Sequence, residues 1–369
     1  MNYNINEQKL GFDRVLPWEG QVPALVKEGE HYFLQVKAPE AENVTFTMNE
    51  EEFPCTREDD GIWRMEYTLR TGIQYMQLKI DDVEVVTPLL PITYGYSRPY
   101  NYVALEMKNE EFYQVKDVPH GSVRREYFFS KVTGEWESCM VYTPYCYEEE
   151  TEREFPVLYL QHGHGENETG WIEEGKVHFI MDNLIQAKEA KPFIIVMNNG
   201  MVQTKNAEGK RIVDHTIFPE YLIKDVIPYI DKKYRTIKNK DSRAMAGLSM
   251  GSIQTSITAF EYPEYFSYIG LFSGFLRDFI QGDKIMDMVQ RGKASDKHLR
   301  ILDSKETFKN NLKIFFRAMG ENDIFIQKFL EEDELLSKKD ISCIRIIYEG
   351  GHDWNVWRRC IRDFAKLLF

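Results

Sequence analysis

Over the last two thirds of this 369-residue chain, apolar runs typical of buried strands alternate with segments whose apolar residues have helical spacing. This alternation restricts the fold more than any other feature of the sequence. Three strand-like runs, at residues 155–163, 192–200 and 242–249, are dominated by apolar residues, which indicates strands covered on both faces. Residues 176–188 and 218–234 carry apolar side chains at spacings of three and four, as amphipathic helices do. The alternation predicts an α/β fold with a doubly wound parallel sheet.

The first part of the chain has a different pattern. From about residue 20 to 105, short alternating runs are separated by turn signals such as Asp59-Asp60-Gly61 and Asp81-Asp82. This pattern predicts a small antiparallel β-sandwich. A stretch rich in proline and tyrosine, residues 88–102, is expected to be a loop. Pro119 and Gly121 are chain breakers, so we expect domains at residues 1–118 and 119–369.

Composition and charge exclude several functions. A net charge of −13 and a pI near 5.3 disfavour nucleic-acid binding. No apolar run approaches the roughly 18 residues of a membrane span. The cysteine count of five is odd, and no pair has metal-ligand spacing, so we expect free thiols, no metal and no cofactor. These features favour a cytoplasmic protein, or a secreted one if an export signal has been removed; a homo-oligomer is compatible with them.

The sequence GLSMG, residues 247–251, stands where a strand ends and a helix begins. Gly247 and Gly251 lack a Cβ, so that strand and helix can approach each other closely around Ser249. This arrangement is the G-x-S-x-G nucleophile elbow, which exposes a serine hydroxyl at the edge of the sheet. The alternative is an ordinary serine in a turn.

A serine nucleophile needs a base and an acid, which on this fold follow it in the order serine, acid, histidine. His352 follows the last strand and is the expected base, whereas His298 lies in a polar stretch typical of a surface. The acid should follow the preceding strand. Asp323 is the expected residue and Glu321 the alternative, although either could cap the next helix.

The tetrahedral intermediate requires two backbone N–H donors, an oxyanion hole. Met250 is expected to provide one. The loop HGHGENETGW, residues 162–171, should provide the other, from His164 or Gly165. A metal site at His162 and His164 would lack a third ligand, and His162 is more simply explained as a brace for the loop.

Several motifs occur in an order that resembles one family. FPVLYLQHGHGENETGW, FIIVMNNG, YLIKDVIPYIDKKYRTI, SRAMAGLSMGSIQT, YPEYFSYIGLFSG and GGHDWNVWR resemble the esterase-D-like α/β-hydrolases, among them carbohydrate esterase family 1 with its feruloyl and acetylxylan esterases. The resemblance covers residues 120–369. The preceding part is similar to the early-set immunoglobulin-like domains of such enzymes. The resemblance implies Ser249 as nucleophile, His352 as base and Asp323 as acid.

The resemblance also implies a substrate class: feruloylated or acetylated plant cell-wall oligosaccharides, or small esters. Trp171 and Trp354 flank the motifs and could stack on a phenolic or sugar ring, although core packing is the alternative. The polar segment 276–310 could form a lid. Two other functions compete: an acetylxylan, short-chain or enterochelin-type siderophore esterase, and a carbohydrate-binding sandwich beside an inactive hydrolase scaffold. No basic cluster for a siderophore is evident, and the intact serine, aspartate and histidine argue against an inactive scaffold.

Overall fold

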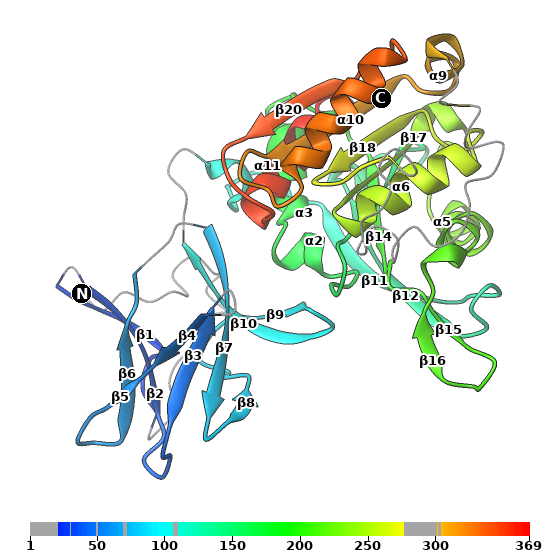
Figure 1. The fold of residues 1–369 in the computed structure, drawn as a ribbon. Helices are drawn as coiled ribbons and strands as arrows, with labels where there is room; N and C mark the ends of the chain where they lie inside the picture. Colours follow the sequence, from blue (N-terminus) through cyan, green and yellow to red (C-terminus); the bar gives the residue numbers. More distant parts are fainter. Residues whose placement is uncertain are drawn as a thin grey trace. The chain divides into compact units, whose positions relative to one another are not determined.

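The computed structural model describes residues 21–369 apart from 30, 49–50, 69–71, 106–109, 277–300 and 302–303. The chain divides into two compact units, Met1–Glu111 and Phe112–Phe369, which Figure 1 shows as an all-β part and a larger α/β part.

The amino-terminal unit contains two antiparallel sheets, with the strand orders β1-β2-β6-β5 and β4-β3-β7-β10-β9. The strands are β1 Leu25–Glu28, β2 His31–Lys37, β3 Val44–Met48, β4 Glu51–Pro54, β5 Thr56–Arg57, β6 Ile62–Glu66, β7 Gly72–Ile80, β8 Val83–Val85, β9 Ile92–Gly95 and β10 Arg98–Leu105. Leu34 and Trp63 of the first sheet and Phe46 and Met76 of the second are buried in one common core. The expected β-sandwich is therefore present.

The prediction of a loop at residues 88–102 was wrong, because most of this segment forms the β9–β10 hairpin. The two turn residues, Tyr96 and Ser97, have φ values of 51° and 64°. A two-residue turn with both φ values positive is usually made by Asn and Gly. Tyr and Ser give no such signal, so the hairpin could not be seen in the sequence.

An eight-stranded sheet forms the centre of the second unit, in the order β11-β12-β14-β13-β17-β18-β19-β20. Its strands are β11 Ser122–Phe129, β12 Trp136–Thr143, β13 Val157–Gln161, β14 Ile194–Asn198, β17 Arg243–Leu248, β18 Tyr268–Phe272, β19 Ile314–Gly320 and β20 Ile344–Tyr348. The β11–β12 and β12–β14 pairs are antiparallel, and the remaining pairs, from β14–β13 onward, are parallel. The predicted α/β class is thus confirmed.

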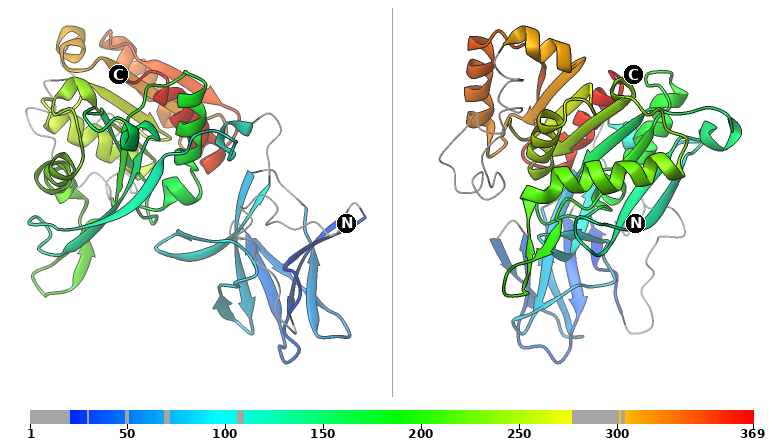
Figure 2. Two further views of the ribbon diagram at one scale, coloured as in Figure 1. Left: turned by 180° about the vertical axis from the view of Figure 1, so that it is seen from behind. Right: turned by 90° about the vertical axis from the view of Figure 1, so that its right-hand side faces the viewer.

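Helices cover both faces of this sheet (Figure 2). They are α1 Cys146–Glu149, α2 Gly170–Glu173, α3 Val177–Gln186, α4 Phe218–Tyr221, α5 Ile227–Lys233, α6 Met250–Glu261, α9 Lys305–Asn311, α10 Ile326–Lys338 and α11 Trp354–Ala365. A π-helical turn, Leu222–Val226, joins α4 to α5. Pro228 follows it at the start of α5, and its missing N–H explains why the predicted single helix at 218–234 is irregular. Within the described residues, no helix is long and apolar enough to cross a membrane.

One element of the second unit was not expected. A short hairpin, β15 Gln203–Lys205 and β16 Arg211–Val213, projects from the segment after β14 (Figure 1). In the predicted lid, residues 277–300 and 302–303 lie outside the described residues. Of the described residues of the segment 276–310, Leu276, Ile301 and Phe308 are buried in the core of the unit.

The boundary between the units falls at residue 112, before the expected position at 119. Asn183 of α3 donates from Nδ2 to the backbone oxygens of Phe112 and Gln114, both at 2.9 Å. The guanidinium of Arg358 in α11 lies 4.2 Å above the ring of Tyr113. These contacts to helices far along the chain attach residues 112–118 to the second unit.

Candidate active site

The candidate nucleophile lies on a sharp turn between β17 and α6. Ser249 has φ 50° and ψ −118°, a conformation that residues with a side chain rarely adopt. A Cβ on Gly247 would lie 2.4 Å from the backbone of Gly251, and one on Gly251 would lie 2.6 Å from the backbone oxygen of His162. Only glycine fits at either position, so the turn has the geometry expected of a nucleophile elbow.

The expected acid and base meet in the structure. His352 Nδ1 and Asp323 Oδ2 are 2.9 Å apart, and the second carboxylate oxygen accepts the backbone N–H of Phe325 at 2.9 Å. The Asp323 side chain is fully buried, whereas that of His352 is 20% exposed. A carboxylate here accepts the Nδ1 proton and leaves Nε2 free to act as a base. Glu321, the alternative acid, is exposed, and His298 lies outside the described residues.

Two aromatic rings fix the orientation of His352. Its ring meets those of Phe325 and Trp357 edge-on, with centroids 5.4 and 5.1 Å apart. Trp357 Nε1 donates to Ser273 Oγ at 3.0 Å. Ser273 follows β18, the strand whose last residue accepts the backbone N–H of Ser249 at 2.8 Å. The imidazole is therefore tied through Trp357 to the strand beside the serine.

The hydrogen bond that would complete the triad joins Ser249 Oγ to His352 Nε2. Both side chains are partly exposed, and Oγ makes no hydrogen bond among the described residues. Such bonds are often long without substrate and shorten when it binds. The pairing of serine and histidine rests on their common sheet edge and on the Trp357 link, and it stays a prediction.

The hydrogen bonds of the loop after β13 show which of its backbone N–H groups have an acceptor within the protein. The N–H of Gly163 is already used, because it donates to Glu166 Oε2 at 2.8 Å. The N–H groups of Met250, His164 and Gly165 have no acceptor in the part of the chain that the structure describes. Gly165, with φ 79°, turns the loop at this point. Met250 as one donor, and His164 or Gly165 as the other, stay predictions.

His162 braces this loop, as expected. Its Nδ1 donates to the oxygen of Gly163 at 2.8 Å, and its Nε2 accepts the N–H of Gly200 at 2.8 Å. Burial lowers the pKa of His162, which favours the neutral ring that these two bonds require. The loop after β13 is thereby attached to the segment after β14.

The two candidate substrate-binding tryptophans are core residues. Trp171 and Trp354 are each 1% exposed, too little to offer a ring face to a substrate. They pack edge-on against each other, and Trp354 packs in the same way against Trp357. Trp171 Nε1 donates to the backbone oxygen of Gln161 at 2.9 Å. The stacking role is corrected: these rings connect His352, through Trp357, to the start of the oxyanion loop.

Glu166 was missed by the sequence analysis, because a lone glutamate in a polar loop is usually exposed. Here it is buried behind the oxyanion loop. Burial, together with the nearby Glu174, raises its pKa to about 8, although the hydrogen bond from Gly163 opposes this shift. The carboxyl group is therefore mostly protonated near neutral pH. Its hydrogen bond to Gly163 fixes the loop that presents His164 and Gly165.

Replacing Glu166 by glutamine should make the stability of the protein less dependent on pH. The folded state holds the Glu166 proton up to about pH 8, whereas an unfolded glutamate loses it near pH 4.3, so the wild type is destabilised as pH rises between these values. Each pKa unit corresponds to about 1.4 kcal/mol. Glutamine keeps the acceptor for Gly163 but does not titrate. Thermal unfolding at pH 5 and pH 8 should show the variant gaining a few kcal/mol relative to wild type at pH 8.

The exposed neighbour Glu173 provides a matched control. Glu173→Gln should leave the difference in melting temperature between pH 5 and pH 8 as it is in the wild type. Parallel pH curves for Glu166→Gln and wild type would contradict the assigned protonation of Glu166.

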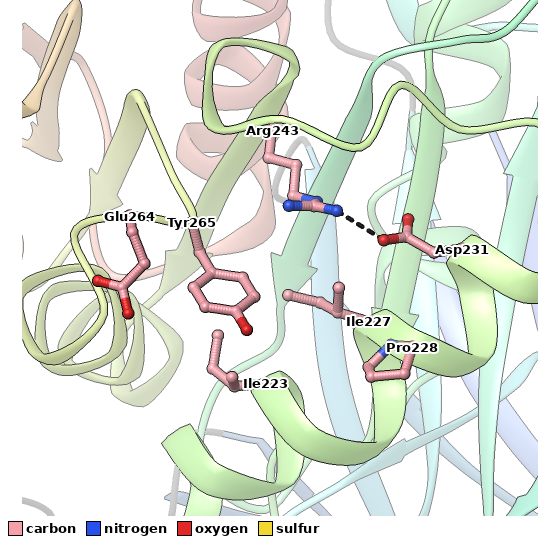
Figure 3. A pocket seen from close by; sticks show the side chains of 7 residues that line it. All are labelled: Ile223, Ile227, Pro228, Asp231, Arg243, Glu264 and Tyr265. Atoms are coloured by element: carbon pink, nitrogen blue, oxygen red, sulfur yellow. Dashed lines mark hydrogen bonds and ion pairs between the residues drawn. The ribbon is translucent and has the colours of Figure 1, made fainter.

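A hollow at the other end of the sheet is not part of this site (Figure 3). Arg243, its central residue, begins β17, whereas Ser249 follows the end of the same strand. Arg243 Nη2 and Asp231 Oδ2 form an ion pair at 2.6 Å, and Thr236 donates to the same carboxylate. These contacts fix α5 to the sheet. The hollow is lined by Ile223, Ile227, Pro228, Asp231, Arg243, Glu264 and Tyr265.

Comparison with known proteins gives a family and a fold. The Esterase family model matches residues 130–364 of this chain. An endo-1,4-β-xylanase/feruloyl esterase from Xylanibacter ruminicola is 32% identical over 363 residues, which cover 95% of this chain and 46% of the relative. The chain thus spans about half the length of that relative.

Solved structures share the fold. A ferulic acid esterase from Anaeromyces mucronatus in complex with ferulic acid is 21% identical, with a TM-score of 0.56, covering 72% of this chain and 98% of the other. An enterobactin esterase from Shigella flexneri is 12% identical, with a TM-score of 0.60, covering 95% of this chain and 94% of the other. The second similarity extends over most of the chain.

Proposed function

This chain belongs to the Esterase family, and from that premise we propose that it is a serine carboxylic ester hydrolase which releases ferulic or a related hydroxycinnamic acid from esterified arabinoxylan oligosaccharides. The observation that carries the activity is the pair of His352 and Asp323 at the sheet edge where Ser249 stands on its strained turn. The similarity to a xylanase/feruloyl esterase over 95% of the chain supports the substrate class.

The acylation step follows from the positions of these groups. Ser249 Oγ attacks the ester carbonyl carbon, and its proton passes to Nε2 of His352. Asp323 stabilises the imidazolium. The negative charge on the carbonyl oxygen is held by the N–H of Met250 and one N–H of the loop at His164 and Gly165. When the intermediate collapses, the sugar alcohol leaves with the proton from His352, and the acyl group stays on the serine.

Deacylation repeats the chemistry with water. His352 takes a proton from a water molecule, whose oxygen attacks the acyl carbonyl carbon, and the same N–H groups hold the new oxyanion. Collapse returns the proton to Ser249 Oγ and releases the hydroxycinnamic acid. The enzyme supplies a base, a nucleophile and two amide donors, and the reaction needs no cofactor.

The alternatives differ in the acyl group and not in the catalytic residues. An acetylxylan or short-chain esterase would use the same triad on acetyl esters. A siderophore esterase of the enterochelin type shares the fold, but the sequence similarity is low: the enterobactin esterase is 12% identical to this chain.

We propose a cytoplasmic location, because the five cysteines are free thiols: Cys55, Cys139, Cys146, Cys343 and Cys360.

A panel of esters tests the proposal. We expect kcat/KM to be highest for methyl ferulate and feruloylated arabinoxylan oligosaccharides, and at least about tenfold lower for acetylated xylo-oligosaccharides, since pocket fit to an acyl group is worth about 1–3 kcal/mol. Enterobactin and p-nitrophenyl acetate complete the panel. A preference for enterobactin or for acetyl esters would replace the proposed substrate, and inactivity on every ester would overturn the enzyme itself.

A further inference from the structure

The strands β11 and β12 form a hairpin (Figure 1). Three large aromatic side chains of this hairpin are exposed. Tyr127 is 61% exposed, Phe129 is 53% exposed and Trp136 is 73% exposed. Single exposed aromatic residues are ordinary on protein surfaces, whereas a contiguous group marks a binding surface. We call Tyr127, Phe129 and Trp136 the aromatic ledge.

The strand register places the three rings on one face. Phe129 pairs with Trp136, and Tyr127 pairs with Ser138. The rings of Phe129 and Trp136 meet edge-on, with their centroids 6.0 Å apart. Phe128, between the two β11 residues of the ledge, points to the other face and is buried. The ledge is thus a continuous surface.

This surface adjoins the oxyanion loop. Ser138 shares its face and donates from Oγ at 2.7 Å to Oε1 of Glu168, which belongs to the loop 162–171 that carries the candidate amide donors. Cys139 pairs with Asn198, the last residue of β14. Trp136 therefore lies beyond the carboxyl end of that parallel strand, at the sheet edge where the nucleophile stands.

The hairpin tip is held firmly. Asp225 Oδ2 accepts hydrogen bonds from Ser130 Oγ at 2.6 Å and from the N–H of Val132 at 2.9 Å. Arg211 of β16 donates to both carboxylate oxygens of Glu135, at 2.7 and 2.9 Å. A surface fixed in this way binds a ligand without first having to be ordered, which favours affinity.

We propose that the aromatic ledge binds the sugar chain that carries the scissile ester, and so sets a preference for oligosaccharide esters over small esters. The inference rests on the proposed function. The C–H faces of a pyranose or furanose ring are apolar and pack on flat aromatic rings. The ion pair of Arg211 and Glu135 offers hydrogen-bonding groups beside the aromatic ledge.

A second copy of the chain is the competing occupant of the ledge, because β11 is the last strand of the described sheet. The exposed Arg124 and Arg125 disfavour strand pairing at that edge.

The experiment compares two substrates with the same acyl group. For each variant, kcat/KM is measured on methyl ferulate and on a feruloylated arabinoxylan oligosaccharide of defined length. We expect the ratio of the second value to the first to fall about 3- to 10-fold in Trp136→Ala, the size of an aromatic contact, and to recover largely in Trp136→Phe. Arg124→Ala is the matched control, since Arg124 lies on the other face of β11 and is exposed. Its ratio should equal that of the wild type.

An unchanged ratio in Trp136→Ala would overturn the sugar contact, as would a wild-type dimer that the substitution converts to monomers in light scattering. If the wild type does not hydrolyse methyl ferulate, the proposed esterase has failed separately from the ledge. Calorimetry with the unesterified oligosaccharide then decides: binding to wild type that weakens in Trp136→Ala supports the ledge, and no binding to wild type refutes it.

Discussion

Replacing Ser249 by alanine is expected to lower kcat for methyl ferulate about 10⁶-fold, the effect of losing the nucleophile in a serine hydrolase. Without Oγ, no acyl-enzyme can form, and only the oxyanion amides and substrate binding are left to promote attack by water. Alanine at this position has the same strained backbone as serine, with φ 50°, so the variant should fold as the wild type does. Steady-state hydrolysis of methyl ferulate measures the loss.

Covalent labelling separates the loss of the nucleophile from a loss of folding. A fluorophosphonate should add one adduct to the wild type, on the peptide that contains Ser249, and none to the alanine variant. Ser267 is a buried serine before β18, at the opposite end of the sheet, and Ser267→Ala should keep both labelling and turnover. More than a few per cent of wild-type activity in Ser249→Ala would exclude this serine as the nucleophile.

The parts of the site that follow strand ends could be predicted from the sequence. Buried strands are recognisable from local composition, and the fold brings the carboxyl ends of parallel strands to one edge. Ser249, Asp323 and His352 each follow such an end. The position in the strand order thus brings Asp323 and His352 together and places Ser249 at the same edge, although 249 and 352 are 103 positions apart in the sequence. The pairing of Ser249 with His352 stays a prediction.

Other features depend on contacts that a sequence does not display. Trp171 and Trp354 stand beside the motifs, but a sequence does not say whether an indole faces the substrate or the core, and both are buried. Glu166 looked like a polar loop residue until the structure placed it behind the oxyanion loop. The aromatic ledge had the pattern of an ordinary strand, because its exposure depends on how far β12 extends beyond its neighbour β14.

The domain boundary was displaced for a related reason. Breakers such as Pro119 and Gly121 mark a turn in the chain, and a turn need not coincide with a boundary. Residues 112–118 are held by Asn183 of α3 and by the guanidinium of Arg358 on Tyr113, contacts between segments far apart in the sequence. Tertiary contacts of this kind decide where a unit begins, and local composition does not contain them.

Replacing Asp323 by asparagine should lower kcat about 10⁴-fold through the wrong histidine tautomer. Oδ1 of Asp323 accepts the N–H of Phe325, and Oδ2 faces Nδ1 of His352. An asparagine that keeps the first bond must turn its NH₂ group toward Nδ1. The imidazole then carries its proton on Nε2, where it cannot take one from Ser249. We therefore expect kcat to fall with KM little changed, measured on methyl ferulate between pH 6 and 9.

The neighbouring exposed carboxylate gives the control for this prediction. Glu321→Gln removes a charge two residues away without touching the imidazole, so its kcat should remain within about twofold of wild type, as is usual for surface substitutions. A protonated imidazole Nε2 in Asp323→Asn should also be visible as a changed ¹⁵N shift of His352. An asparagine variant within tenfold of wild-type kcat would mean that the buried carboxylate does not set the tautomer, and that the histidine is oriented by Phe325 and Trp357 alone.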